Sequence, residues 1–181
     1  MKIVLITGPS GVGKDSLLRI ARQHFRKNKN VVFAKRYITR VPDDNEQNYY
    51  VDPKAFELLQ ENDFFVSHWQ AHGNCYGIAH TEFGAQSENR LAIVSVSRRV
   101  ITDFESCFER VITLELTVSN DILRQRLQRR GRENAAAIEK RLDRASLPVL
   151  AKKMIPFDNS ETLVISGKRF LILLNSLLKE Q

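Results

Sequence analysis

Cysteine is scarce in this sequence, and its scarcity excludes a scaffold built on disulfides. The two cysteines, Cys75 and Cys107, stand in no CxxC pair and in no zinc-binding pattern. A disulfide framework or a structural zinc site needs several such residues at short spacings. We therefore expect two ordinary reduced thiols.

Long apolar runs are also missing. No stretch approaches the roughly 18–20 apolar residues that cross a bilayer. The run at residues 2–7 is too short for a signal peptide, has no small-residue cleavage site, and leads directly into a glycine-rich segment. With 43% hydrophobic and 27% charged residues, the composition is that of a globular domain. We expect a cytoplasmic protein without a membrane partner.

Aromatic residues are absent from the most basic segment, which argues against nucleic-acid binding. The net charge is +7, and it is densest over residues 124–132, where five arginines occur: Arg124, Arg126, Arg129, Arg130 and Arg132. Surfaces that bind single strands interleave cations with aromatic rings for base stacking. Phosphorylated small molecules explain the positive charge at least as well.

The hydrophobic pattern predicts an α/β fold. Short β-branched runs predict strands at 2–7, 30–34, 64–69, 91–96, 110–116 and 162–165, with a loop at 72–77. Helical patterns occupy 16–27, 53–61, 97–108, 119–130, 134–147 and 167–180. Buried strands alternating with amphipathic helices favour a three-layer parallel sheet with helices on both faces.

A chain of 181 residues suits one domain. We assign its core to residues 1–34, 89–118 and 148–181. Residues 35–88 break the strand–helix rhythm and are interpreted as an inserted acceptor-binding region. Residues 119–147, hinged near Gly131, are interpreted as a helical lid.

Residues 8–14, Gly-Pro-Ser-Gly-Val-Gly-Lys, match the P-loop pattern, with a predicted strand before and a predicted helix after. Glycines let the backbone approach phosphates closely, and the loop N–H groups and the helix N-terminus form a positive cradle. The lysine reaches the β- and γ-phosphates. The pattern predicts ATP binding by Gly8, Pro9, Ser10, Gly11, Val12, Gly13, Lys14, Asp15 and Ser16.

One position departs from this pattern. The residue after Lys14 is normally Ser or Thr, whose hydroxyl binds Mg²⁺, but here it is Asp15. A carboxylate is a good ligand for Mg²⁺, so Asp15 is a candidate metal ligand. The alternative is that Asp15 only stabilises the first turn of the helix electrostatically.

With these residues the chain resembles the guanylate kinase-like P-loop kinases, and more closely the ribose 1,5-bisphosphate phosphokinases of bacterial phosphonate catabolism. The resemblance spans nearly the whole chain. It rests on Gly-Lys-Asp-Ser-Leu-Leu (13–18), Arg-Tyr-Ile-Thr-Arg (36–40), Trp-Gln-Ala-His-Gly-x-x-Tyr-Gly-Ile (69–78), Arg-Leu-x-x-Arg-Gly-Arg-Glu (126–133) and Asp-Asn-Ser (158–160). It implies transfer of phosphate from ATP, with Mg²⁺, to ribose 1,5-bisphosphate, giving ADP and 5-phosphoribosyl 1-diphosphate (PRPP).

Guanylate kinases bind the acceptor phosphate through arginine and tyrosine and the base through a nearby glutamate. By resemblance Arg40 matches the arginine, and Tyr49 or Tyr50 together with Tyr76 match the tyrosines. Glu46 lies near the acidic position. A second arginine, expected between Arg40 and Glu46, is missing, which counts against GMP as the acceptor. Arg36 and Lys35 are the two candidates for supplying the missing charge.

The resemblance also concerns two further acceptor residues. His72 is expected to bond a sugar hydroxyl or a phosphate, although a structural histidine fits the pattern as well. Guanylate kinases carry an aspartate at the end of the strand matching 91–96, where this chain has Ser95-Val96-Ser97. We expect Asp15 to compensate at the metal, and Arg98, at the carboxyl end of that strand, to contact the second acceptor phosphate.

The lid carries the remaining predicted residues. Arg126, Arg130 and Arg141 match lid and hinge arginines of guanylate kinases, and Arg126 and Arg130 share a helix face. Closure would place their guanidinium groups on the transferring phosphate, whereas the simpler alternative is a solvated basic face. Asn159 is the expected contact to adenine, although its segment is by spacing alone a turn.

Three alternatives to a ribose 1,5-bisphosphate phosphokinase stay open on the sequence. A nucleoside monophosphate kinase is disfavoured by the missing arginine and by Asp15. A non-catalytic guanylate kinase-like module often lacks the loop lysine or glycines, which this chain keeps. A nucleic-acid-binding protein would show binding that depends steeply on salt. We expect a monomer or homodimer that binds only small molecules.

Overall fold

Five strands form the central sheet of the structure, a computed structural model that describes residues 1–41, 47–84, 89–131, 134–145 and 148–180. The strand order is β2-β7-β1-β8-β9, and all four neighbouring pairs are parallel. The bounds are β1 Lys2–Thr7, β2 Val31–Phe33, β7 Leu91–Ser95, β8 Val111–Thr117 and β9 Met154–Asp158. The chain order reverses at β1, so the loop that follows β1 lies where ligands bind in open α/β sheets.

β1 is central because both of its faces are apolar. Ile3 and Leu5 enter one hydrophobic core, and Val4 and Ile6 enter the other. Successive side chains of a strand point to opposite faces, so a continuous apolar run requires cover on both sides. The predicted parallel sheet between helical layers is thereby confirmed.

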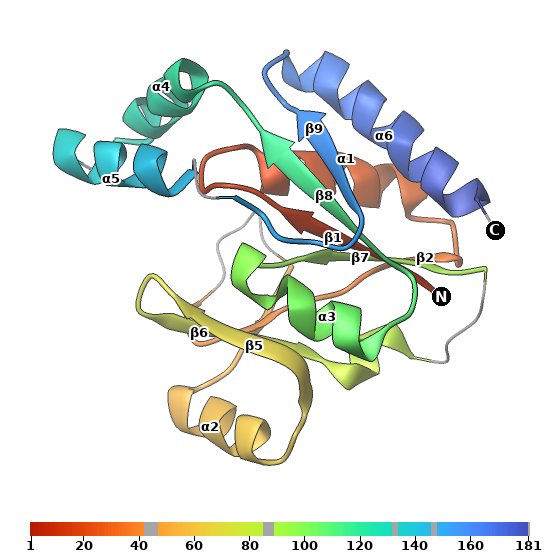
Figure 1. Cartoon of the computed structure of the whole chain (residues 1–181). Helices are drawn as coiled ribbons and strands as arrows, with labels where there is room; N and C mark the ends of the chain where they lie inside the picture. The colour runs from red at the N-terminus through yellow and green to blue at the C-terminus, as the bar shows by residue number, and fades with distance from the viewer. Residues whose placement is uncertain (42–46, 85–88, 132–133, 146–147, 181) are drawn as a thin grey trace.

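Helices cover both faces of the sheet (Figure 1). α1 (Lys14–Phe25) and α6 (Leu163–Lys179) pack together on one face. α3 (Ile101–Cys107), preceded by the short helix η2 (Arg98–Val100), covers the other face. α1 and α6 approach closely because Gly167 has no side chain: a Cβ there would lie 2.9 Å from Ile20 Cδ1.

A second sheet lies beyond α3, in the order β4-β3-β6-β5. Its strands are β3 Tyr37–Ile38, β4 Tyr49–Tyr50, β5 Phe65–Ala71 and β6 Asn74–Ala79, accompanied by α2 (Pro53–Glu61) and the short helix η1 (His80–Phe83). β5 and β6 form an antiparallel hairpin that turns at His72 and Gly73. Both turn residues have positive φ, +53° and +74°, as type I′ hairpin turns require.

Two further helices project from the end of the sheet where β8 finishes (Figure 1). They are α4 (Asn120–Arg130) and α5 (Ala135–Ala145). They share a small core of their own, formed by Leu123, Leu127, Ile138 and Leu142. The division into core, acceptor-binding region and lid that we drew from the sequence stays a prediction.

The sequence interpretation was wrong at two places. Residues 162–165 are not a strand: Thr162 caps the first turn of α6 by accepting from Ile165 N–H, and the last strand is β9. β9 contains Pro156, which weakens a strand pattern but is tolerated at a sheet edge. Residues 74–77, expected in a loop, belong to β6. Within the described part of the chain no helix combines the length and apolarity needed to cross a bilayer.

Candidate active site

The glycine-rich loop begins directly after β1 and ends in α1, as the sequence predicted. Gly8, Gly11 and Gly13 have φ values of +143°, +97° and +99°, a region that side chains with a Cβ rarely adopt. The loop is also tightly packed. A Cβ on Gly8 would lie 2.5 Å from Leu116 O, and one on Gly13 would lie 2.6 Å from Asn159 Nδ2. The first glycine and the last are therefore required by backbone shape and by space.

Lys14 lies over the loop that precedes it. Its Nζ donates to Gly8 O at 2.6 Å and to Pro9 O at 3.0 Å. The ammonium group and the N-terminus of α1 thus place positive charge at the same loop, which is an arrangement that binds phosphate. The predicted loop residues Pro9, Ser10, Val12 and Ser16 lie in or directly after the same turn.

Val12 is buried, and its carbonyl joins the loop to two distant segments. Asn159 Nδ2 donates to Val12 O at 2.6 Å, and Arg126 Nη1 donates to the same oxygen at 3.0 Å. Arg126 Nη2 donates to Asn159 O at 2.9 Å. A hollow of about 270 Å³ adjoins this cluster, lined by Gly11, Gly13, Ser16, Arg126, Asn159, Glu161 and Leu163 among others. It is the candidate site for the nucleoside of ATP.

α5 also reaches the glycine-rich loop. Arg141 Nη1 donates to Ser10 Oγ at 2.8 Å. Of the three predicted lid arginines, the structure therefore brings Arg126 and Arg141 to the loop. Arg130 is the last residue of α4, and its side chain lies outside the described part of the chain.

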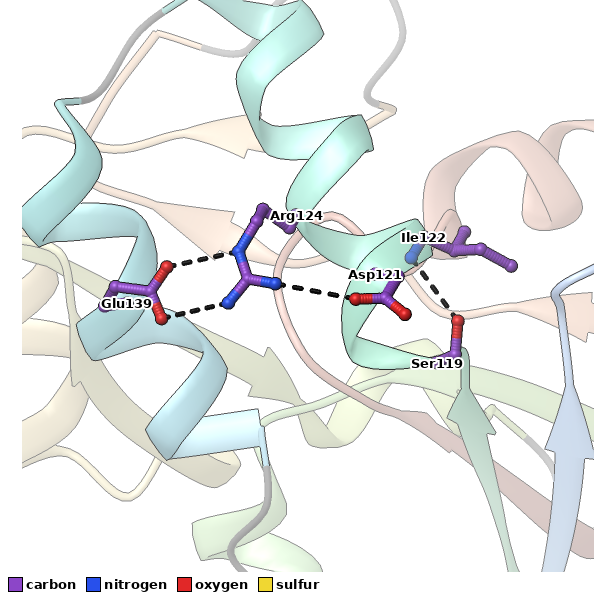
Figure 2. A network of polar contacts seen from close by, with 5 residues as sticks. All are labelled: Ser119, Asp121, Ile122, Arg124 and Glu139. Atoms are coloured by element: carbon purple, nitrogen blue, oxygen red, sulfur yellow. Dashed lines mark hydrogen bonds and ion pairs between the residues drawn. The ribbon is translucent and has the colours of Figure 1, made fainter.

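A network of polar contacts links α4 to α5 (Figure 2). Arg124 donates to both carboxylate oxygens of Glu139, each at 3.1 Å, and lies 3.5 Å from Asp121. The bonds to Glu139 raise the pKa of Arg124. Ser119 caps α4 by accepting from Ile122 N–H at 3.3 Å. The pair and the shared apolar core hold the two helices together.

Asp15 lies exposed in the first turn of α1. Among the described residues its carboxylate accepts no hydrogen bond, and no group of three or more His, Cys, Asp or Glu side chains could hold a metal. Mg²⁺ in phosphate-transferring enzymes is held by one or two carboxylates together with substrate phosphates. A single exposed carboxylate beside a phosphate loop fits such a site.

Arg22, which the sequence analysis missed, lies two turns after Asp15 on α1. Burial lowers the pKa of Arg22, and the positive charge of Arg36 lowers it further, while Asp15 raises it. The Arg22 guanidinium lies 5.5 Å from the centre of the Phe33 ring. The i, i+7 spacing of Asp15 and Arg22 places both on one helix face and was the signal available in the sequence.

A hollow of only about 10 Å³, about the size of one water molecule, brings Arg22, Arg36 and Asp15 together at the carboxyl ends of β2 and β7. Its lining includes Ser95 and Asn48. Arg36 is held from two sides: its Nε donates to Asn48 Oδ1 at 3.2 Å, and its guanidinium lies 5.8 Å from the Tyr76 ring centre. Tyr76 is in turn stacked on Trp69, with ring centroids 5.5 Å apart. The structure thus groups two of the predicted acceptor residues, Arg36 and Tyr76, with Arg22.

The other predicted acceptor residues are less closely grouped. Tyr49 lies in β4 and packs on Tyr37, with Lys35 Nζ 4.8 Å from its ring centre. His72 is exposed at the tip of the β5–β6 hairpin. Arg98 begins η2 just beyond β7, as expected, and Arg40 Nη1 donates to Val41 O at 3.3 Å. Glu46 lies outside the described residues.

A cavity of about 430 Å³ lies elsewhere, lined by Lys2, Phe108 and Arg110 among others. Its lining also includes Val111. Lys2 and Val111 are the first residues of β1 and β8, so this cavity lies at the amino ends of the strands, opposite the glycine-rich loop. Because substrates bind at the carboxyl ends of parallel strands, the smaller hollows beside the loop are the better candidates for the active site.

Comparison of folds relates the chain to small-molecule kinases. Guanylate kinase from Anaplasma phagocytophilum superposes with a TM-score of 0.63 at 18% identity, covering 100% of this chain and 87% of that one. A gluconokinase from Sinorhizobium meliloti 1021 gives a TM-score of 0.52 at 14% identity, with 98% and 94% coverage. At these identities the likeness shows the shared fold.

Comparison of sequences is more specific, although no family model matches. Two relatives are named ribose 1,5-bisphosphate phosphokinase PhnN. The one from Desulfomicrobium baculatum is 38% identical over 92% of this chain and 90% of the relative. The one from Rhizobium etli is 32% identical over 98% of this chain and 91% of the relative. A relative of that name from Janthinobacterium sp. (strain Marseille) is longer: 36% identity covers 96% of this chain but 39% of the relative. The glycine-rich loop, the kinase fold and these full-length similarities together show that the chain belongs to the ribose 1,5-bisphosphate phosphokinase family.

Proposed function

We propose that this kinase transfers the terminal phosphate of ATP to ribose 1,5-bisphosphate, releasing ADP and PRPP, in alkylphosphonate degradation in the cytoplasm. An oxygen of the sugar's 1-phosphate attacks the γ-phosphorus, and the bond from that phosphorus to the β–γ bridging oxygen breaks. The leaving electron pair stays on ADP. Membership of the family carries the proposal, and the two hollows on either side of the glycine-rich loop support it.

The donor side is assigned to the loop and its neighbours. The N–H groups of residues 8–16 and the ammonium of Lys14 bind the phosphates of ATP, and the hollow beside Asn159 takes the nucleoside. Asp15 is the proposed ligand for Mg²⁺, which when bound neutralises charge on the β- and γ-phosphates. Because the acceptor is a phosphate oxygen and already a nucleophile, the site needs no strong general base.

The catalytic arginines come from the two projecting helices. The contact from Arg141 to Ser10 supports a role at the γ-phosphate, because it already places a guanidinium on the loop. Arg126 and Arg130 are proposed to act from α4. Guanidinium groups fixed around the transferring phosphate stabilise the charge that develops in the transition state.

The acceptor side is assigned to the mouth of the hollow lined by Arg22 and Arg36, because the hollow itself, about 10 Å³, holds no more than one water molecule. A bisphosphate has one phosphate that reacts and one that must be held, and two guanidinium groups beside a single carboxylate favour an anion. We assign the non-reacting phosphate to Arg22 and Arg36. Arg40, Glu46, Tyr49, His72, Tyr76 and Arg98 complete the proposed acceptor site.

The nearest alternative acceptor is a nucleoside monophosphate such as GMP. It is disfavoured because Ser95 and Ser97 stand where an acidic residue is expected, and because a second arginine after Arg40 is missing. A coupled assay of ADP release with ribose 1,5-bisphosphate and GMP in parallel separates the two. We expect turnover with the sugar bisphosphate, and turnover with GMP alone would overturn the proposal.

A further inference from the structure

We propose that Asn159 and Arg126 position the glycine-rich loop by holding the Val12 carbonyl away from the phosphates, which turns the Gly13 N–H toward them. Neither residue needs to touch a reacting atom for this role, which is separate from the action on the transferring phosphate proposed above for Arg126. The proposal depends on polyphosphate binding by the loop and not on the identity of the acceptor.

The hydrogen bonds around Val12 carry the inference. Its carbonyl oxygen accepts from Asn159 Nδ2 at 2.6 Å and from Arg126 Nη1 at 3.0 Å. A carbonyl oxygen has two lone pairs, so these two donors use its full capacity. Arg126 Nη2 also donates to Asn159 O at 2.9 Å. The guanidinium therefore links two main-chain carbonyls as a planar fork, which a lysine cannot imitate.

The geometry of the peptide bond gives the consequence. The peptide between Val12 and Gly13 is trans, and in a trans peptide the C=O and N–H point in opposite directions. Fixing the carbonyl on the side of Asn159 therefore fixes the Gly13 N–H on the other side. If this peptide turned over, the cradle would lose one donor and present a carbonyl oxygen to the phosphates instead.

Asn159 is well placed to hold the loop because it is itself anchored. Its own N–H donates to Thr117 O at 2.8 Å, at the end of β8, and only 3% of its surface is exposed. The side chain fills the space where a Cβ on Gly13 would stand, 2.6 Å from Asn159 Nδ2. The sheet, the loop and α4 are thus tied at one point by residues 12, 126 and 159.

This role differs from the contact to adenine that the sequence suggested for Asn159. A contact to the base contributes to affinity only when the ligand has a base. Holding the loop contributes for every ligand with a chain of phosphates, including inorganic tripolyphosphate. The two ligands therefore separate the two roles.

The experiment measures binding of ATP and of tripolyphosphate, both with Mg²⁺, by calorimetry. Asn159→Leu keeps a branched side chain without the donor, and Arg126→Lys keeps the charge without the fork. We expect each substitution to raise the dissociation constants of ATP and of tripolyphosphate by the same factor, roughly tenfold. The affinity for ribose 1,5-bisphosphate should stay unchanged. The control is Lys140→Gln, which removes one positive charge from an exposed residue of the neighbouring helix α5 that lines neither hollow, and it should change the affinity for neither ligand by more than about twofold.

Melting curves without ligand accompany every variant, and Arg126→Lys, at a partly exposed residue, remains informative if Asn159→Leu does not fold. Weakened binding of ATP with unchanged binding of tripolyphosphate would assign Asn159 to the base and overturn the proposal. Equal losses of affinity in the Lys140→Gln control would overturn it too. Failure of the unaltered chain to bind tripolyphosphate would overturn it as well, because the loop would then not be the anchor for phosphates.

Discussion

At the scale of single residues, position 15 separates this chain from the general P-loop pattern. The pattern places a hydroxyl there, and this chain has a carboxylate that is exposed at the start of α1. Its neighbourhood contains the guanidinium of Arg22, and among the described residues the lining of the shared hollow includes no second carboxylate. Metal binding and electrostatic stabilisation of the helix are both consistent with that position, and they predict different responses to Mg²⁺.

Asp15→Ala is expected to raise the Mg²⁺ concentration needed for half-maximal turnover, because the substitution removes the proposed oxygen ligand. Asp15→Ser, which restores the common hydroxyl, should recover part of the loss. The measurement is the rate of ADP release against Mg²⁺ concentration at saturating ATP. If neither variant changes the Mg²⁺ requirement or the turnover, Asp15 serves the helix and not the metal.

Arg22→Gln is expected to raise the KM for ribose 1,5-bisphosphate by roughly ten- to a hundredfold, since a charge-assisted contact to phosphate contributes about 1.5–3 kcal/mol. The KM for ATP should stay the same. Arg19→Gln is the matched control, because Arg19 is an exposed arginine on the same helix and does not line the hollow. Equal effects of the two substitutions would show that Arg22 acts only through net charge.

At the scale of secondary-structure elements, the two projecting helices behave as one unit. α4 and α5 share an apolar core, and Arg124 joins them through Glu139 (Figure 2). Both side chains are substantially exposed, 38% and 57%, and exposed ion pairs contribute little to global stability. The pair is therefore better placed to set the orientation of α5, which carries Arg141 to the loop, than to stabilise the fold.

Arg124→Ala and Glu139→Gln are expected to leave the melting temperature nearly unchanged and to raise the KM for ATP, because α5 would hold Arg141 less firmly against Ser10. The double variant should resemble either single variant, since both remove the same bond. Kinetics and melting curves of the three variants test this. A large fall in melting temperature, or strictly additive effects on KM, would contradict it.

At the scale of the whole molecule, Lys2 ties the start of the chain to its last helix. Its side chain is only 8% exposed, and Nζ donates to Leu177 O at 2.6 Å and to Glu180 O at 2.8 Å. Cations are favoured at the C-terminal end of a helix, where carbonyls lack partners. This contact joins the start of β1 to the end of α6 at the amino ends of the strands, opposite the glycine-rich loop.

Lys2→Met is expected to lower the free energy of unfolding by about 2 kcal/mol, because the buried carbonyl of Leu177 and the part-buried carbonyl of Glu180 lose a charged donor. Lys179→Met, at an exposed residue of the same last turn, should change it little. Denaturant titrations of both variants give the comparison. Equal stability of the two variants would mean that the contacts of Lys2 contribute nothing.

The same lysine predicts a dependence on pH. Burial lowers the pKa of Lys2 below 10.5, although Glu180 opposes the shift. Between the folded pKa and 10.5 the unfolded chain binds more protons than the folded chain. Lys2 therefore makes the free energy of unfolding rise with pH across that alkaline window.

Tyr37 has the opposite effect in the same range. Burial raises the pKa of Tyr37 above 10.0, so Tyr37 lowers the free energy of unfolding as the pH rises past 10. Subtracting the unfolding profile of Lys2→Met from that of the unaltered chain isolates the lysine, and a difference that falls with pH would refute its assignment.

The sequence by itself determined the glycine-rich loop, the parallel sheet and the buried strand that centres it, because these depend on local pattern. Three glycines at fixed spacing and a continuous apolar run permit few other conformations. Local pattern failed where long-range packing decides: β9 contains a proline that only an edge position accommodates, and 162–165 turned out to start α6. Only the tertiary structure brought Arg22 beside Arg36 and tied residues 12, 126 and 159 together. Contacts between residues so distant in sequence arise from the packing of the sheet and helices, which no spacing along the chain encodes.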